Sequence, residues 1–146
     1  MRGPAGRGSE PLADDDGGSV LLLTIGYAAL ALALILVCVD ATSLYLAQKR
    51  LDAVADAAAL AAADGFVLTV DADGPHATLS AADVRDQAAA IVAVAGGDTR
   101  VVSASAPDGV SSRVTVAASW HPPVLTLFVP DGVALEATAT SRTALR

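Results

Sequence analysis

The sequence predicts an α+β protein in which an N-terminal transmembrane helix continues into a helical stalk and a small head follows. Three observations support this architecture. An uninterrupted apolar run extends over residues 19–39. The residues after it contain no glycine or proline before Gly65, which favours continued helix. The C-terminal part contains one helical pattern and then three β-rich runs, which predicts one helix packed on a three-stranded antiparallel sheet.

The apolar run has the length and composition of a membrane-spanning helix. At about 1.5 Å per residue, roughly 20 residues cross the hydrocarbon core of a bilayer. Residues 19–39 contain no charge, and a chain of 146 residues offers no core thick enough to surround them as a buried helix. A cleaved signal peptide would have a shorter apolar core, a basic flank and a better cleavage site than residues 39–41. We therefore expect a permanent anchor.

Small residues within this anchor form a candidate packing face. Gly26, Ala29 and Ala33 share one side of the helix, which would let a second helix approach closely in lipid. Cys38 is the single cysteine of the chain, so no intrachain disulfide is possible. We interpret it as a small apolar residue that faces lipid or a neighbouring helix.

The N-terminal tail and the overall charge exclude one class of partner. Residues 1–18 are rich in Gly, Pro and charged residues, which predicts a disordered tail. The net charge of −7 leaves no basic patch for phosphate, so we expect no nucleic acid partner. Charge does not orient the anchor, because Arg2 and Arg7 are far from it and residues 14–16 are all aspartate.

Residues 40–65 predict an amphipathic stalk that continues the anchor helix. Small apolar side chains recur at helical spacing on one face, at Leu44, Ala47, Leu51, Ala55, Ala58 and Ala62. Lys49, Asp52 and Asp56 fall on the other face. The apolar face has two interpretations. It packs against neighbouring chains along a shared rod, or it forms an intramolecular core with the chain's own sheet.

Residues 66–146 predict the head, which we expect to fold in isolation. Residues 66–78 look like a linker with one possible strand and a turn at residues 71–75. Ser80 and Asp83 then predict the N-terminal cap of a helix. An apolar stripe follows, before two glycines end the helix, and it consists of Val84, Ala88, Ile91 and Ala95.

Three strands are expected after this helix, at residues 100–106, 112–120 and 133–142. Pro107, Asp108 and Gly109 predict the turn of a hairpin between the first two. Trp120 is the expected large aromatic side chain of the core, because it alternates with Val116 and Ala118 on one face of its strand.

The residues that could carry chemistry are few and scattered. His76 follows a turn proline and His121 precedes two prolines, and no metal-binding, nucleophilic or phosphate-binding motif accompanies them. Asp71, Asp73 and Gly74 resemble part of a calcium loop but lack its later glutamate. We therefore expect no catalytic, cofactor or metal site and no small-molecule substrate.

Residues 17–63 resemble the N-terminal region of TadE/TadG-like Flp (tight-adherence) pilus assembly proteins. The resemblance rests on GGSV before the apolar run, on the tyrosine-bearing stalk and on the stretch ADAAALA at residues 55–61. The matching stalk residues are Asp40, Tyr45, Arg50, Leu51, Asp56 and Leu60. The family implies a single membrane pass, a cytoplasmic N-terminus and an extracytoplasmic pilin-like head. It also implies partners, namely other pilin-like subunits that bind through the transmembrane and stalk helices in a secretion-related machine.

One departure from the family pattern concerns processing. Prepilin-like members have a glycine before the cleaved bond and a glutamate at the fifth mature position, whereas cleavage between Gly18 and Ser19 would place Leu23 there. We expect the chain to remain uncut. The expected role is structural or related to assembly, without catalysis. The first alternative is a membrane-tethered binding or sensing module, and the second is an anchored enzyme.

Overall fold

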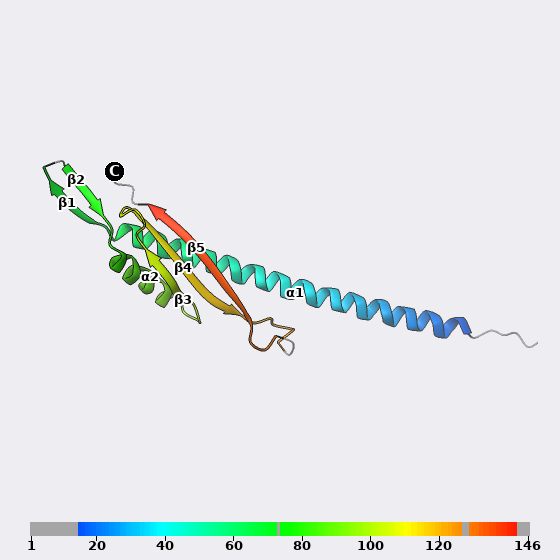
Figure 1. Ribbon diagram of the computed structural model, residues 1–146. Helices are drawn as coiled ribbons and strands as arrows, with labels where there is room; N and C mark the ends of the chain where they lie inside the picture. The colour runs from blue at the N-terminus through cyan, green and yellow to red at the C-terminus, as the bar shows by residue number, and fades with distance from the viewer. Residues whose placement is uncertain (1–14, 73, 127–128, 143–146) are drawn as a thin grey trace, which may run out of the picture. The chain divides into compact units, whose positions relative to one another are not determined.

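A computed structural model describes residues 15–72, 74–126 and 129–142 as an α+β protein with two helices and two antiparallel sheets (Figure 1). Its elements, in chain order, are α1 (Asp15–Asp64), β1 (Val67–Asp71), β2 (Gly74–Thr78), α2 (Ala81–Ala95), β3 (Arg100–Ser105), β4 (Ser111–Trp120) and β5 (Val133–Arg142). The chain divides into two compact units, Met1–Cys38 and Val39–Arg146. Each unit is described separately below.

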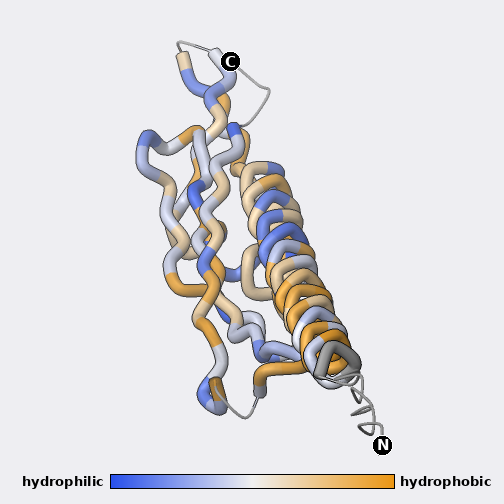
Figure 2. The backbone as a smooth tube through the Cα atoms, turned by 90° about the vertical axis from the view of Figure 1, so that its right-hand side faces the viewer, coloured by the Kyte–Doolittle hydropathy of each residue, from blue (hydrophilic) through white to orange (hydrophobic). Residues whose placement is uncertain are grey.

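The first unit contains the apolar part of α1. Helix α1 begins at Asp15, and residues 1–14 of the expected tail lie outside the described residues. One helical stretch, Gly18–Asp64, is long and apolar enough to cross a membrane by length and composition. None of its most apolar window is buried, and Figure 2 shows the hydrophobic colouring of this part of the helix. The buried core helix considered above is therefore not what forms here.

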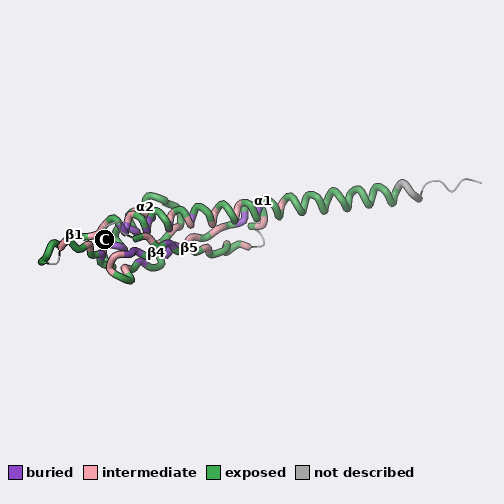
Figure 3. Tube along the Cα trace, turned by 90° about the horizontal axis from the view of Figure 1, so that it is seen from above, coloured by how far each residue is buried: buried purple, intermediate pink, exposed green. Residues whose placement is uncertain are grey.

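The C-terminal part of α1 belongs to the second unit and supplies one wall of its core. Five of its buried side chains belong to the main hydrophobic cluster, and they are Leu51, Ala55, Ala58, Ala59 and Ala62. Leu44 and Ala47 on the same face are half-buried. Of the two interpretations of the stalk's apolar face, the structure has the intramolecular core, and Figure 3 shows the buried residues gathered where α1, α2 and the sheet meet.

Helix α2 begins and ends where the sequence predicts. Its N-cap, Ser80, accepts a hydrogen bond from the backbone N–H of Asp83 at 3.1 Å and donates one to the Asp83 carboxylate at 2.6 Å. Gly96 ends the helix at a φ of +69°, where a side chain would be strained. Val84, Ala88 and Val92 form its buried stripe. Their spacing of four residues places them on one face, toward the sheet.

The main sheet has the order β3-β4-β5, with every pair antiparallel. Val114 and Val116 of β4 are fully buried and lie opposite Ala139 and Ala137 of β5. They form the face covered by the helices. On the other face Thr115 and Thr138 share a hydrogen bond of 2.9 Å between their hydroxyls. The sheet thus has one apolar, covered face and one face rich in Ser and Thr, as expected when a single layer of helices packs on it.

The predicted linker at residues 66–78 is instead a β-hairpin. β1 pairs with β2 in antiparallel register, from Val67 opposite Thr78 to Asp71 opposite Gly74. Gly74 has a φ of +116°. The second strand contains Gly74 and Pro75 and has almost no β-branched residues. Its sequence therefore carries no strand signal. Both strands are largely exposed, so burial imposes no alternation that a sequence could reveal.

Two aspartates fasten the ends of the main sheet. The backbone N–H of Ser119 donates to the Asp98 carboxylate at 2.7 Å, and this hydrogen bond is the main cause that lowers the pKa of Asp98. Asp108 accepts from the Ser111 hydroxyl at 2.9 Å and from the Val110 N–H at 3.1 Å, and these bonds lower the pKa of Asp108.

These two lowered pKa values predict a loss of stability in acid. A carboxyl group whose pKa is lower in the folded state stabilises the fold above its unfolded pKa, here about 3.8. That contribution is lost as the pH falls through the lower, folded pKa. We expect the thermal midpoint to decrease below this pH, and to decrease less steeply in Asp98→Asn. An acid slope equal to that of the wild type would show that Asp98 does not contribute.

Candidate functional site

The candidate site is the part of α1 that carries the sequence motif, together with the residues that contact it. In the apolar part, Gly26, Ala29 and Ala33 are all exposed. A Cβ atom added at Gly26 would have no neighbour within 4 Å among the described residues. The Thr24 hydroxyl donates to the Val20 carbonyl at 2.8 Å, so this polar group is satisfied within the helix. The small-residue face is thus open for a second helix.

Asp40 is the first polar residue after the apolar run and is only 6% exposed. One of its carboxylate oxygens, Oδ1, accepts a hydrogen bond of 3.3 Å from the backbone N–H of Val124, in the turn that follows β4. The other oxygen, Oδ2, is buried and has no hydrogen-bond partner among the described residues. Asp40 therefore fastens the turn after β4 to α1, at the cost of one unsatisfied polar atom.

This geometry predicts opposite outcomes for two substitutions of Asp40. Asp40→Asn keeps the oxygen that accepts from Val124, so the free energy of unfolding should be equal to or above that of the wild type. Asp40→Leu leaves the Val124 N–H without its partner and should cost about 1–3 kcal/mol. Thermal denaturation of the full chain in detergent measures both. An equal loss in the two variants would mean that the carboxylate itself is required.

Ser43 and Trp120 form a second tie between α1 and the end of β4. The indole Nε1–H of Trp120 donates to the Ser43 hydroxyl at 3.1 Å. Trp120 is half-buried, so it is not the fully buried aromatic anchor that the sequence suggested. The largest fully buried side chains are Val84, Val114, Val116 and Ser112. The core is instead assembled mainly from alanine and valine side chains, with Leu51 and Leu79.

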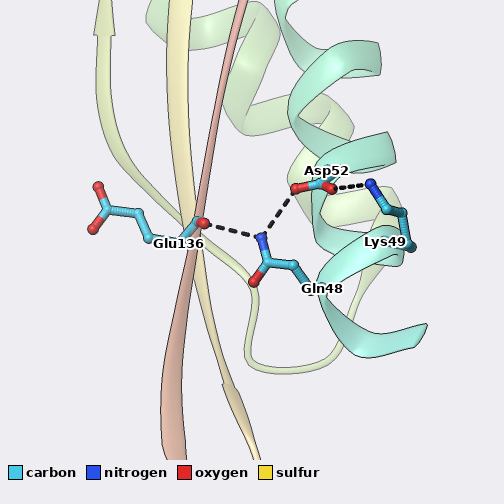
Figure 4. A network of polar contacts seen from close by, with 4 residues as sticks. All are labelled: Gln48, Lys49, Asp52 and Glu136. Atoms are coloured by element: carbon cyan, nitrogen blue, oxygen red, sulfur yellow. Dashed lines mark hydrogen bonds and ion pairs between the residues drawn. The ribbon is translucent and has the colours of Figure 1, made fainter. Parts of the chain in front are cut away.

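A polar network lies further along the stalk (Figure 4). The Gln48 side-chain amide donates to Asp52 at 3.0 Å and to the backbone carbonyl of Glu136 at 3.1 Å, so it joins α1 to the edge strand β5. Lys49 pairs with Asp52 at 3.1 Å. The hydrogen bonds from Gln48 and then Lys49 lower the pKa of Asp52, and Asp52 raises the pKa of Lys49. Because both ions are exposed, the pair itself contributes little to stability.

The motif residues of the stalk divide between the two sides of α1. Asp40 and Leu51 are buried against the sheet. The other four motif residues, Tyr45, Arg50, Asp56 and Leu60, are exposed. The exposed fraction is 61% for Tyr45 and 58% for Leu60. At 3.6 residues per turn, Tyr45, Asp56 and Leu60 fall within about 60° of one another. We call Tyr45, Arg50, Asp56 and Leu60 the outer face of the stalk.

Comparison with known proteins matches the same stretch. Residues 18–65 match the family model Tad, whose description reads "Putative Flp pilus-assembly TadE/G-like". Residues 18–65 are therefore similar to this family, and we call them the TadE/G-like segment. The resemblance noted in the sequence is thereby confirmed over the anchor and the stalk. Neither the curated proteins nor the solved structures give a match to this chain.

The two histidines lie outside the TadE/G-like segment and serve separate local roles. His76 Nε2 lies 3.3 Å from the Asp71 carboxylate, on the exposed β1-β2 hairpin. The ring of His121 lies beside Gly132, where an added Cβ would come within 2.9 Å of it. Among the described residues, no group of three or more His, Cys, Asp or Glu side chains could hold a metal ion.

Three residues in the contacts of the TadE/G-like segment with the main sheet and the turn after β4 were missed by sequence reasoning. Ser43 lies within the segment, and Val124 and Glu136 lie outside it. Val124 contributes a backbone N–H and Glu136 a backbone carbonyl. Ser43 contributes its hydroxyl. Backbone groups have no residue-specific signal in a sequence. Ser43 is a polar residue on a half-buried position of the stalk, which was the one available indication of a tertiary hydrogen bond.

Proposed function

We propose that the chain is a membrane-anchored, non-catalytic component of an Flp (tight-adherence) pilus assembly and secretion system. The N-terminus lies in the cytoplasm and the pilin-like C-terminal domain lies outside. The observation that carries this proposal is the TadE/G-like match over residues 18–65. It coincides with the helix that is apolar enough to span a membrane and with the stalk that supports the second unit.

The outer face of the stalk is the proposed contact for another pilus assembly subunit. Its four motif residues make no contribution to the buried core, because all are exposed, so packing of this chain does not explain their presence. Tyr45 and Leu60 are large side chains that the rest of the described chain leaves exposed. A partner helix that covers them would gain about 25 cal/mol for each Å² of apolar surface buried. The small-residue face at Gly26, Ala29 and Ala33 is a separate proposed contact, for a second helix in lipid.

Site-specific photo-crosslinking in membranes of a pilus-forming cell tests this contact. A photoreactive amino acid at Leu60 should give an adduct with another pilus assembly subunit. The matched control is Val94, which is 87% exposed on α2 and lies outside the stalk, and it should give none. Absence of an adduct from both Leu60 and Tyr45 in cells that assemble pili would contradict the proposed contact.

The second part of the proposal is that the chain stays uncut at Gly18. Gly18 and Ser19 lie inside α1, whereas proteolytic cleavage concentrates at exposed, irregular segments. Leu23 stands where processed relatives have a glutamate. Intact mass spectrometry of the membrane-purified protein should give the mass of the full chain. A species that begins at Ser19 and disappears in Gly18→Leu would show that the chain is processed.

A further inference from the structure

The end of the main sheet that carries Trp120 lies at the level where the apolar anchor stops. β4 runs antiparallel to the stalk, because its first residues contact Ala59 through Ser112 and its last residue contacts Ser43 through Trp120. Asp40, which directly follows the last apolar residue Val39 in the chain, is bonded to Val124. These two hydrogen bonds place this end of the sheet beside the residues that directly follow the anchor.

The side chains at this end form an apolar patch. We define the collar patch as Trp120, Val124, Leu125 and Val133. Val124 is 38% and Val133 39% exposed, while Trp120 and Leu125 are half-buried. Val133 lies directly opposite Trp120 in the β4-β5 register. The sequence has no charged residue from Pro122 to Pro130, so nothing in this stretch opposes contact with an apolar medium.

We propose that the collar patch is a second membrane-contacting element, which inserts into the interfacial layer of the bilayer that holds the anchor. This inference rests on the proposed membrane anchoring. Ser43 lies three residues beyond Asp40, about 4.5 Å along the helix. The polar interfacial layer on each side of the hydrocarbon core is about 5–8 Å thick. Trp120, bonded to Ser43, falls within that layer, where tryptophan is enriched because its ring is apolar and its N–H is polar.

Lipid is favoured over a protein partner because of this continuity with the anchor. A patch fixed to α1 within one turn of the apolar run cannot leave the bilayer surface while the anchor is inserted. Two rigid ties hold it there, the 3.3 Å bond from Val124 to Asp40 and the 3.1 Å bond from Trp120 to Ser43.

Trp120 is the single tryptophan of the chain, so its fluorescence tests the proposal without a label. The full chain is reconstituted in phosphatidylcholine vesicles whose acyl chains carry bromine either near the headgroup or near the chain end. Bromine quenches tryptophan only at short range. We expect strong quenching by the shallow bromines and weak quenching by the deep ones.

A double variant and a matched control test the patch itself. Val124→Asp with Val133→Asp should lose most of the quenching, because aspartate is costly to place in an apolar medium. Val70→Asp, at a 75% exposed valine of the β1-β2 hairpin, should retain it. Circular dichroism melting confirms that each variant is folded. If the double variant does not fold, the depth of Trp120 in the bilayer, measured by bromine quenching of the wild type, tests the proposal by itself.

Alkaline extraction of the same vesicles distinguishes failure of the membrane anchor from failure of the collar patch. A chain that stays in the vesicles but shows no quenching of Trp120 would overturn the collar patch and leave the anchor intact. Protection of Trp120 from a soluble quencher without quenching by lipid would indicate a second copy of this chain on the patch, and would also overturn the proposal. A chain released from the vesicles would overturn the membrane anchoring and, with it, this inference.

Discussion

A fragment that begins at Phe66 is expected to be unfolded in water, contrary to the expectation from the sequence alone, whereas a fragment that begins at Asp40 is expected to fold. The reason is the shared core. Five buried side chains of the stalk, from Leu51 to Ala62, cover the same cluster as Val84 of α2 and Val116 of β4. Removing the stalk exposes that cluster to water. A domain of this size has only about 5–15 kcal/mol of stability to lose.

Circular dichroism and Trp120 fluorescence during thermal unfolding measure the difference. The fragment of residues 40–146 should unfold in one cooperative transition, and the fragment of residues 66–146 should show none. A point variant refines the test in the full chain. Ala58→Leu overfills a site that is 0% exposed and should cost about 1–3 kcal/mol. Ala57→Leu, at the exposed neighbouring position, should cost little. A cooperative transition in the shorter fragment would contradict the shared core.

Replacement of residues 19–39 by a polar sequence of equal length should move the whole protein from the membrane to the soluble fraction. The apolar run of α1 has no cover from the described residues in its most apolar window, so we expect insertion into lipid to remove it from water. The wild-type chain should stay in membranes after alkaline extraction. A variant with residues 19–39 in scrambled order is the matched control, and it should also stay, because burial in lipid depends on composition and length.

Proteolysis of spheroplasts tests the direction in which the chain crosses the membrane. External protease should digest the region after Val39 and spare the first eighteen residues. Protection of the C-terminal domain would reverse the proposed topology. Release of the wild-type chain by alkali would contradict the anchor itself.

Local signals were sufficient to predict most of the elements. Ser80 and Asp83 cap α2, Gly96 ends it, and Pro107 to Gly109 separate β3 from β4. The third strand was expected at residues 133–142, which are the bounds of β5. In each case a capping, turn or β-branched pattern acts over a few residues, so a sequence contains it directly.

Tertiary choices were harder to predict. The apolar face of the stalk could equally pack within the chain or against a neighbour, because alanine spacing is the same in both cases. The sequence indicated one possible strand and the turn of the β1-β2 hairpin, but not its second strand, because β2 is exposed and contains Pro75. The bond between Asp40 and Val124 joins residues 84 positions apart through a backbone N–H. No pattern in the sequence records such a contact.

The central claim is that this chain takes part in Flp pilus assembly from the membrane, and a count of surface pili tests it most directly. Electron microscopy would compare the source cell, a strain that lacks the coding sequence, and that strain complemented with the full chain or with the variant polar at residues 19–39. The account predicts pili in the source cell and with the full chain, and none in the other two. Undiminished pili in the strain without the coding sequence would contradict it.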